Sequence, residues 1–128
     1  MKAFSLVNST IITGGSLLRG KAVVVKDSKI IDVTDEETLP ADIERIDLKG
    51  QYLSPGLIDI QVNGAGGALC GTDFSAEKLG IMARALLKEG TTGFLATAAT
   101  NTLEEYHHII RSAVDYRKEA LSNFLGLH

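Results

Sequence analysis

The spacing of apolar and polar residues changes near residue 54. Before that point the apolar runs are short and β-branched, and turn material such as Gly14-Gly15 and the polar stretch 26–28 separates them. Runs of this length and spacing are typical of short strands in an antiparallel sheet. We predict such strands at 11–12, 22–25, 29–33 and 43–48. Residues 1–53 are therefore interpreted as a small β-rich domain, part of a β-sandwich, with a structural role.

From residue 54 onward, predicted strands and helices alternate. Residues 57–62 form a mostly apolar run, as in a strand that is covered on both faces. Ser75 has the position of a helix N-cap, and Gly90 ends the predicted helix. The apolar stripe of this helix consists of Leu79, Met82, Ala83, Leu86 and Leu87.

The same pattern then repeats along the chain. Residues 92–97 and 124–128 are predicted strands. Between them, Thr102 and Glu105 have the spacing of a capping box, which opens a second helix. The buried face predicted for this helix consists of Tyr106, Ile109, Ile110 and Ala113.

Three strands joined by two crossover helices predict an α/β fold with a parallel sheet and right-handed connections. Two architectures satisfy this pattern. One is a shortened flavodoxin-like sheet beside which the first part of the chain pairs. The other is the opening part of a (β/α)8 TIM-type barrel, which takes roughly 250 residues to close. The hydrophobic pattern alone leaves both open.

The composition narrows the class of protein. The chain has 128 residues, of which 45% are hydrophobic and 23% charged, so it can bury a core. A formal net charge of -3 without a basic run argues against nucleic-acid binding. The apolar runs are too short to span a bilayer, and the N-terminus is polar again by Asn8, too early for a signal peptide. The single cysteine rules out an intrachain disulfide framework and favours a reducing compartment, so we predict a cytoplasmic protein.

Polar residues gather where the predicted strands end. Gln61 and Asn63 follow the first strand, residues 97–101 the second, and His128 closes the third. Ligands collect at the carboxyl ends of parallel strands in both architectures, and amides both donate and accept hydrogen bonds. We therefore predict that Gln61, Asn63 and His128 line a pocket for a polar, uncharged group. The alternatives are ordinary strand-end hydrogen bonding for the two amides and a frayed end for His128.

Other chemically interesting residues have structural interpretations. Asp59 is out of phase with Gln61 and Asn63, so we expect it to support the strand. The adjacent His107 and His108 cannot point the same way on a helix, which argues against a metal site. Cys70 has no basic neighbour in sequence and is predicted to be an unreactive thiol. The glycines at 64–67 are expected to serve a tight turn.

A resemblance to a known family appears at residues 52–64. The Pro-Gly-Leu-Ile-Asp portion, 55–59, resembles a motif of the amidohydrolase superfamily. Many members follow it with His-x-His, which holds one metal of a binuclear pair. This chain instead has Gln61-Val62-Asn63 and then Gly-Ala-Gly-Gly, which is similar to the N-acetylglucosamine-6-phosphate deacetylases, a branch working with one metal ion. Residues 89–97 and 125–128 are also similar to this family.

The resemblance implies a fold, an activity and a cofactor. The fold would be the β-rich domain 1–53 followed at 54–128 by the first β-α-β-α-β units of an incomplete (β/α)8 barrel. The complete enzyme would use one divalent metal ion, expected to be zinc, to deacetylate a small amino-sugar phosphate, and we expect a homo-oligomer. In the family, the Gly-Leu-His segment continues into Leu-Glu-Gly-Pro, whose glutamate is the first metal ligand.

The resemblance also locates the chemistry outside this chain. The first metal ligand would lie just beyond His128, so we expect neither a catalytic residue nor a metal ligand within the 128 residues. The chain alone is therefore predicted to be inactive and to bind no metal tightly. Two alternatives stay open: a non-catalytic α/β binding or interaction module, or another superfamily member such as a dihydroorotase-like enzyme.

Overall fold

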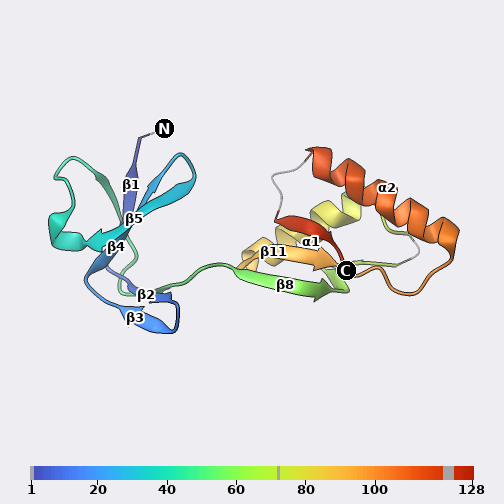
Figure 1. Ribbon diagram of the computed structural model, residues 1–128, viewed down its shortest axis with the longest axis horizontal. Helices are drawn as coiled ribbons and strands as arrows, with labels where there is room; N and C mark the ends of the chain where they lie inside the picture. The colour runs from blue at the N-terminus through green and yellow to red at the C-terminus, as the bar shows by residue number, and fades with distance from the viewer. Residues whose placement is uncertain (1, 72, 120–122) are drawn as a thin grey trace. The chain divides into compact units, whose positions relative to one another are not determined.

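The computed structural model describes residues 2–71, 73–119 and 123–128, and its contacts divide the chain into two compact units. The first unit comprises residues 1–55 and the second residues 56–128. Both are drawn in Figure 1, which labels many of their helices and strands. The fold is mixed α/β with several separate sheets.

The first unit contains two small sheets. The four-stranded sheet has the order β5-β4-β1-β6, and the three-stranded sheet has the order β3-β2-β7. The strands are β1 (Phe4–Val7), β2 (Thr10–Thr13), β3 (Ser16–Leu18), β4 (Lys21–Lys26), β5 (Lys29–Asp35), β6 (Glu44–Asp47) and β7 (Tyr52–Leu53), with the 3-10 helix η1 (Glu36–Thr38) after β5. The prediction of a purely antiparallel sheet is wrong, because β6 lies parallel to β1 and β7 lies parallel to β2. After η1 the chain thus pairs first with β1 and then with β2, in each case parallel to that strand.

A tight turn and a small core hold the first unit together. Asp27 and Ser28 have φ values of 50° and 61°, the left-handed conformation that a two-residue hairpin between β4 and β5 requires. The buried core of the unit consists of Val7, Ala22, Val24 and Leu39. Isolated hairpins are marginal in water, so β5, whose residues are mostly exposed, depends on its pairing with β4.

The second unit is built on three parallel strands, in the order β12-β11-β8. They are β8 (Leu57–Val62), β11 (Thr91–Ala96) and β12 (Phe124–Leu127), joined through α1 (Ala76–Lys88) and α2 (Leu103–Glu119). The predicted loop after β8 contains a hairpin of β9 (Gly64–Ala65) and β10 (Ala68–Leu69). Gly66 and Gly67 turn it with φ values of 61° and 83°, which glycine adopts at little cost.

Both helices pack against one face of this sheet. The core between them contains Phe94 and Phe124, whose ring centroids are 5.5 Å apart, and the Tyr116 ring lies 5.8 Å from Phe124. Leu79, Met82, Ala83, Ile109 and Ala113 complete it, as their helical spacing predicts. Leu87 and Ile110 are half exposed, so their predicted burial is wrong, and Tyr116 occupies the core instead.

The opposite face of the sheet is apolar and uncovered in the described part of the chain. Ile58 is 66% exposed and Leu125 47% exposed. A methyl group at Gly93 would lie 3.0 Å from Leu125 Cδ1 and 3.5 Å from Ile58 Cγ1, so both side chains lie over this glycine. The pairing of β8 with β11 shifts register between Phe94 and Ala96, so the strict alternation of faces does not extend from Val62 back to Ile58. The expectation that residues 57–62 are covered on both faces is therefore wrong for the described residues, because only Val62 of this strand is buried.

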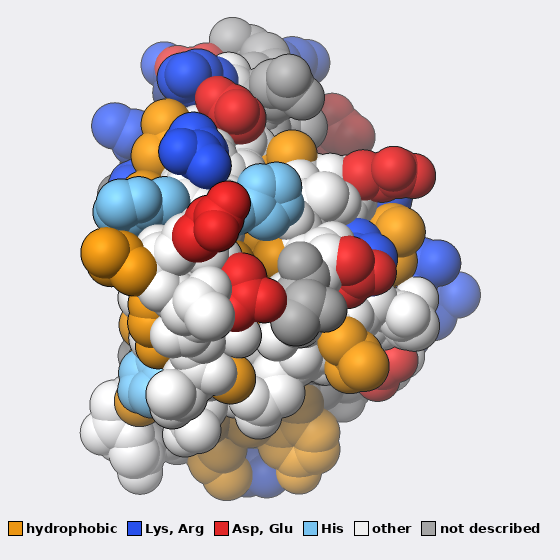
Figure 2. Space-filling view, turned by 90° about the vertical axis from the view of Figure 1, so that its right-hand side faces the viewer, with side chains coloured by type: hydrophobic (Ala, Val, Ile, Leu, Met, Phe, Trp, Pro, Cys, Tyr) orange, Lys and Arg blue, Asp and Glu red, His pale blue; other side chains and the backbone are white. Residues whose placement is uncertain are grey.

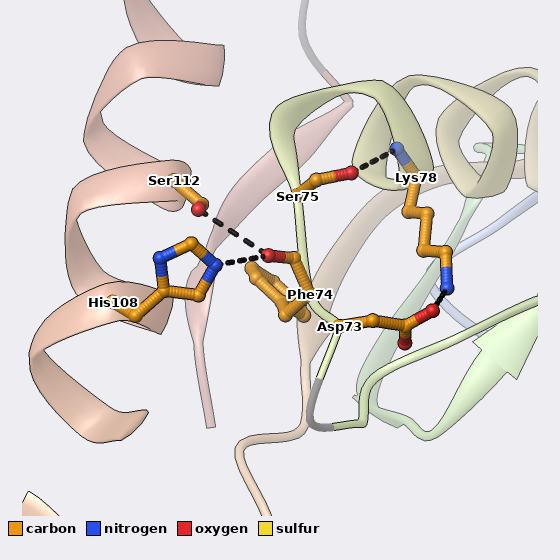
Figure 3. Close-up of polar contacts among 6 residues, drawn as sticks. All are labelled: Asp73, Phe74, Ser75, Lys78, His108 and Ser112. Carbon is orange, nitrogen blue, oxygen red and sulfur yellow. Dashed lines mark hydrogen bonds and ion pairs between the residues drawn. The ribbon is translucent and has the colours of Figure 1, made fainter. Parts of the chain in front are cut away.

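Polar contacts hold the start of α1 and connect it to α2. Ser75 Oγ accepts a hydrogen bond from Lys78 N at 3.2 Å, as a helix N-cap does. The carbonyl oxygen of the preceding Phe74 accepts from His108 Nε2 at 2.9 Å and from Ser112 Oγ at 3.4 Å (Figure 3). These bonds tie α2 to the start of α1.

Within the described residues, neither helix is long and apolar enough to cross a membrane.

Replacing Phe124 by alanine is expected to destabilise the second unit by about 3–5 kcal/mol, because its buried ring contacts two other aromatic rings. Urea unfolding followed by far-UV circular dichroism measures this, since both helices belong to this unit. The adjacent Leu125→Ala substitution is the control. An equal loss from Leu125→Ala would contradict the assignment of the buried face.

Acid should weaken the start of α2. The backbone amide and then the hydroxyl of Thr102 donate to the Glu105 carboxylate, and these bonds hold the pKa of Glu105 below its ordinary value of 4.5. Its stabilising contribution is therefore complete above about pH 4.5 and is lost as the pH falls through the lower, folded-state pKa. Urea unfolding at pH 7 and pH 3 should show a smaller pH dependence for Glu105→Gln, whereas Glu104→Gln should retain the full dependence.

Candidate functional site

The carboxyl ends of the three parallel strands meet in one row of residues. Thr97 N donates to Val62 O at 2.8 Å, and His128 N donates to Ala96 O at 2.9 Å. These bonds continue the registers of β8, β11 and β12 by one residue. They place Asn63, Thr97 and His128 side by side, and we call these three residues the carboxyl-edge row.

The residues immediately before the carboxyl-edge row show which face of the sheet the row belongs to. Val62 and Ala96 are buried in the core beneath the helices, and Leu127 packs against that core. Successive residues of a strand point to opposite faces of a sheet. The carboxyl-edge row therefore belongs to the face away from α1 and α2. Asn63 and His128 are exposed there.

Gln61 lies one position before the buried Val62, just as Asn63 lies one position after it. It is exposed, and its backbone N donates to Asp59 Oδ1 at 2.9 Å. The Asp59 carboxylate thus supports the backbone of β8, which is the structural role expected for it. The pocket-lining role predicted for Gln61, Asn63 and His128 stays a prediction, because the described residues do not enclose the edge where they lie.

Cys70 ties the loop after β8 to the strand ends. Cys70 N donates to Asn63 O at 2.9 Å, and Cys70 Sγ lies 3.4 Å from Val62 O as a weak donor. Burial raises the pKa of the Cys70 thiol, and the Thr97 amide acts in the opposite direction with a smaller effect. The thiol is therefore protonated at neutral pH and closes the loop that carries Asn63.

Thr97 has a feature that sequence reasoning missed. Its Oγ1 atom is buried and has no hydrogen-bond partner in the structure. The sequence placed Thr97 in the polar segment that follows the second strand but did not single it out. Its position directly after an apolar strand was the only signal that could have done so.

The donor set of the carboxyl-edge row suits hydrogen bonding to a neutral polar group. Its exposed groups are the amide of Asn63 and the imidazole of His128, both of which can donate or accept, whereas the hydroxyl oxygen of Thr97 is buried. Zinc in proteins takes imidazole, thiolate or carboxylate ligands, and the row contains one such group. Across the described ranges, no three His, Cys, Asp or Glu side chains gather in a way that could hold a metal ion. Among the described residues, a metal site is thus lacking at this edge.

The charged side chains of the described surface are of both signs. Figure 2 shows acidic, basic and histidine side chains interspersed over one face of the molecule, in keeping with the small net charge of -3. A hollow of about 440 Å³ lies between the β9–β10 hairpin and α1, where Gly66, Ile81, Arg84 and Lys88 contribute to its lining. None of its lining residues belongs to the carboxyl-edge row.

Known proteins resemble this chain along nearly its whole length. Residues 3–53 match the family model described as the NagA composite domain. N-acetylglucosamine-6-phosphate deacetylase from Haemophilus influenzae is 35% identical, over 98% of this chain and 33% of the relative. The human enzyme of that name is 36% identical, over 85% of this chain and 27% of the relative.

Solved structures of the same enzyme resemble the fold. The crystal structure of N-acetylglucosamine-6-phosphate deacetylase from Pasteurella multocida matches with a TM-score of 0.92 at 36% identity, over 98% of this chain and 33% of that one. The Thermotoga maritima structure matches with a TM-score of 0.75 at 26% identity, over 98% of this chain and 31% of that one. The chain thus spans about a third of the length of the relatives it matches.

The thiol of Cys70 should react slowly with a disulfide reagent, because burial raises its pKa and only the thiolate attacks. Reaction with 5,5′-dithiobis(2-nitrobenzoic acid) at pH 8 is expected to be about tenfold or more slower in the folded chain than in urea. Absorbance at 412 nm reports this residue alone, since it is the only cysteine of the chain. Equal rates in the two states would contradict the partial burial of Cys70.

Proposed function

The chain is homologous to the N-terminal part of the N-acetylglucosamine-6-phosphate deacetylases, and we propose that it works as that part of a longer deacetylase. The match to the Pasteurella multocida enzyme carries this proposal, because it combines 36% identity with a TM-score of 0.92 over 98% of the chain. The matched part of the chain includes both units and the strand ends that carry the carboxyl-edge row.

The proposed architecture is a (β/α)8 barrel to which this chain contributes the first three strands. The uncovered face of the β8–β11–β12 sheet supports it, since Ile58 and Leu125 present apolar side chains there. The interior of such a barrel is filled by branched apolar side chains of this kind. Active sites of these barrels lie at the carboxyl ends of the strands, which is the edge that carries Asn63, Thr97 and His128.

The proposed reaction is hydrolysis of the acetamide of N-acetylglucosamine 6-phosphate. Water adds to the amide carbon, the C–N bond breaks, and the products are acetate and glucosamine 6-phosphate. A divalent metal ion, which we propose to be zinc, would when bound lower the pKa of a water molecule and polarise the acetyl carbonyl. The described residues do not fit such an ion, so its ligands are assigned to the rest of the enzyme.

Within this division, Gln61, Asn63 and His128 are proposed to orient the neutral part of the sugar by hydrogen bonds. We place the enzyme in the cytoplasm, since a single cysteine fits a reducing compartment and the proposed substrate is a phosphorylated sugar. A homo-oligomer is also proposed, because association would cover apolar surface such as Tyr52 and Ile30, which are each 68% exposed.

Acetate release from N-acetylglucosamine 6-phosphate tests this proposal. The 128-residue chain alone is expected to release none, and the full-length protein encoded around it is expected to be active and to lose activity when dialysed against a chelator. The reading frame is expected to continue past the His128 codon with Leu-Glu-Gly-Pro. Activity of the isolated chain, or a stop codon directly after His128, would contradict the proposed division.

A further inference from the structure

The only Asn-Gly pair of the sequence, Asn63 and Gly64, lies at the carboxyl edge of the sheet. In such a pair the backbone nitrogen of the glycine can attack the side-chain amide carbon of the asparagine, because glycine has no side chain that shields its nitrogen. The side chain of Asn63 is exposed, so it is free to rotate towards this nitrogen and is accessible to water.

The pairing of the β9–β10 hairpin leaves the N–H group of Gly64 outside its hydrogen-bond ladder. Gly64 pairs with Leu69. One position further, Cys70 N donates to Asn63 O at 2.9 Å, so these two residues form a hydrogen-bonded pair. Hydrogen-bonded and non-hydrogen-bonded pairs alternate along an antiparallel ladder, so Gly64 and Leu69 exchange no backbone bonds. The Gly64 nitrogen therefore points away from β10.

Close packing within the hairpin requires glycine at residue 64. A Cβ atom there would lie 2.6 Å from Ala68 O and 2.6 Å from Leu69 Cδ2. The Ala68 oxygen belongs to the backbone of the hairpin, so it cannot move aside without opening the hairpin. The fold thus keeps an unshielded backbone nitrogen directly after Asn63.

The other three asparagines of the chain are protected. The side-chain nitrogens of Asn8 and Asn123 donate to oxygen atoms at 2.7 Å and 3.0 Å. Asn101 is followed by Thr102, whose backbone N–H donates to a carboxylate at 3.0 Å. Each of the three also precedes a residue that has a side chain. Asn63 alone combines an exposed side chain with a following nitrogen that is unshielded and outside the ladder.

We propose that Asn63 is a site of spontaneous deamidation. The Gly64 nitrogen loses its proton and attacks Asn63 Cγ, the bond between Cγ and Nδ2 breaks, and the Nδ2 group takes up a proton and leaves as ammonia. Water then opens the resulting cyclic imide at one of its two carbonyl carbons. One opening gives aspartate, and the other gives isoaspartate, in which the main chain runs through the side-chain carbon. The reaction consumes only water and is independent of the proposed function.

Either product changes the chemistry of the carboxyl-edge row. An ionised carboxylate only accepts hydrogen bonds, whereas the amide of Asn63 also donates them. Isoaspartate also takes the Asn63 carbonyl, which accepts from Cys70 N, out of the main chain. Deamidation thus converts an edge suited to a neutral polar group into an anionic one.

A second Asn-Gly pair in a different setting separates the effect of the fold from that of the sequence. Lys49→Asn places such a pair before Gly50, at an exposed position with a φ of 53°, which asparagine adopts more readily than lysine. There, however, Gly50 N donates to Asn8 O at 2.7 Å. This nitrogen must lose its hydrogen bond before it attacks.

Both sites are followed in the 128-residue Lys49→Asn chain at pH 8, by tandem mass spectrometry of tryptic digests. In native buffer we expect residue 63 to deamidate about fivefold or more faster than residue 49, because only the nitrogen of Gly50 is held by a hydrogen bond. In guanidinium chloride the two rates should become similar, since the sequence alone then acts. Asn63→Gln is the control, because its longer side chain cannot form the same ring.

The pattern of rates decides the outcome. Faster conversion at residue 63 in native buffer, with two products of equal mass that separate by chromatography, supports the proposal. Similar rates at residues 63 and 49 in native buffer, or slower conversion at residue 63, would show that the fold does not leave the Gly64 nitrogen free to attack and would overturn it. The same mass change in Asn63→Gln would place the reaction at another residue and contradict it as well.

Discussion

The burial of one row of side chains beneath two helices determines the arrangement of the second unit. Val62 and Ala96 fill the core under α1 and α2, and Leu127 packs on it. Because side chains alternate along a strand, the next residue of each strand must belong to the other face. Because the strands are parallel, these next residues meet at one edge. The polar row of Asn63, Thr97 and His128 is thus a consequence of core packing.

The loop after β8 turns this row into a defined surface. Two glycines close the β9–β10 hairpin in left-handed conformations, and Cys70 returns the chain to β8 through bonds to Asn63 O and Val62 O. Asn63 is therefore held by both a strand and a closed loop. Side chains on such supports keep a fixed geometry better than those on long open loops, which suits residues that orient a ligand.

Local signals in the sequence predicted the second unit well. Ser75 and the Thr102–Glu105 pair mark helix starts that the structure reproduces with the expected hydrogen bonds. The first unit was harder, because the parallel pairing of β6 with β1 joins residues about forty positions apart and has no local signature. Tyr116 is buried against the Phe124 ring whereas Ile110 is half exposed, and helical spacing alone does not show which of the two the tertiary packing buries. The unpaired Thr97 hydroxyl could not be predicted, since a missing partner is a property of the folded surroundings.

In the proposed enzyme, the chemistry of the carboxyl edge fits a division of roles between this part of the chain and the rest. Imidazoles at the positions of Gln61 and Asn63 would bring metal ligands to this edge. Amides keep the capacity to donate and accept hydrogen bonds but bind such metals poorly. The edge can then orient a neutral group without competing for the ion. In the proposed barrel, the remaining strands would supply carboxylates and imidazoles, and the apolar face with Ile58 and Leu125 would provide the layer against which they pack.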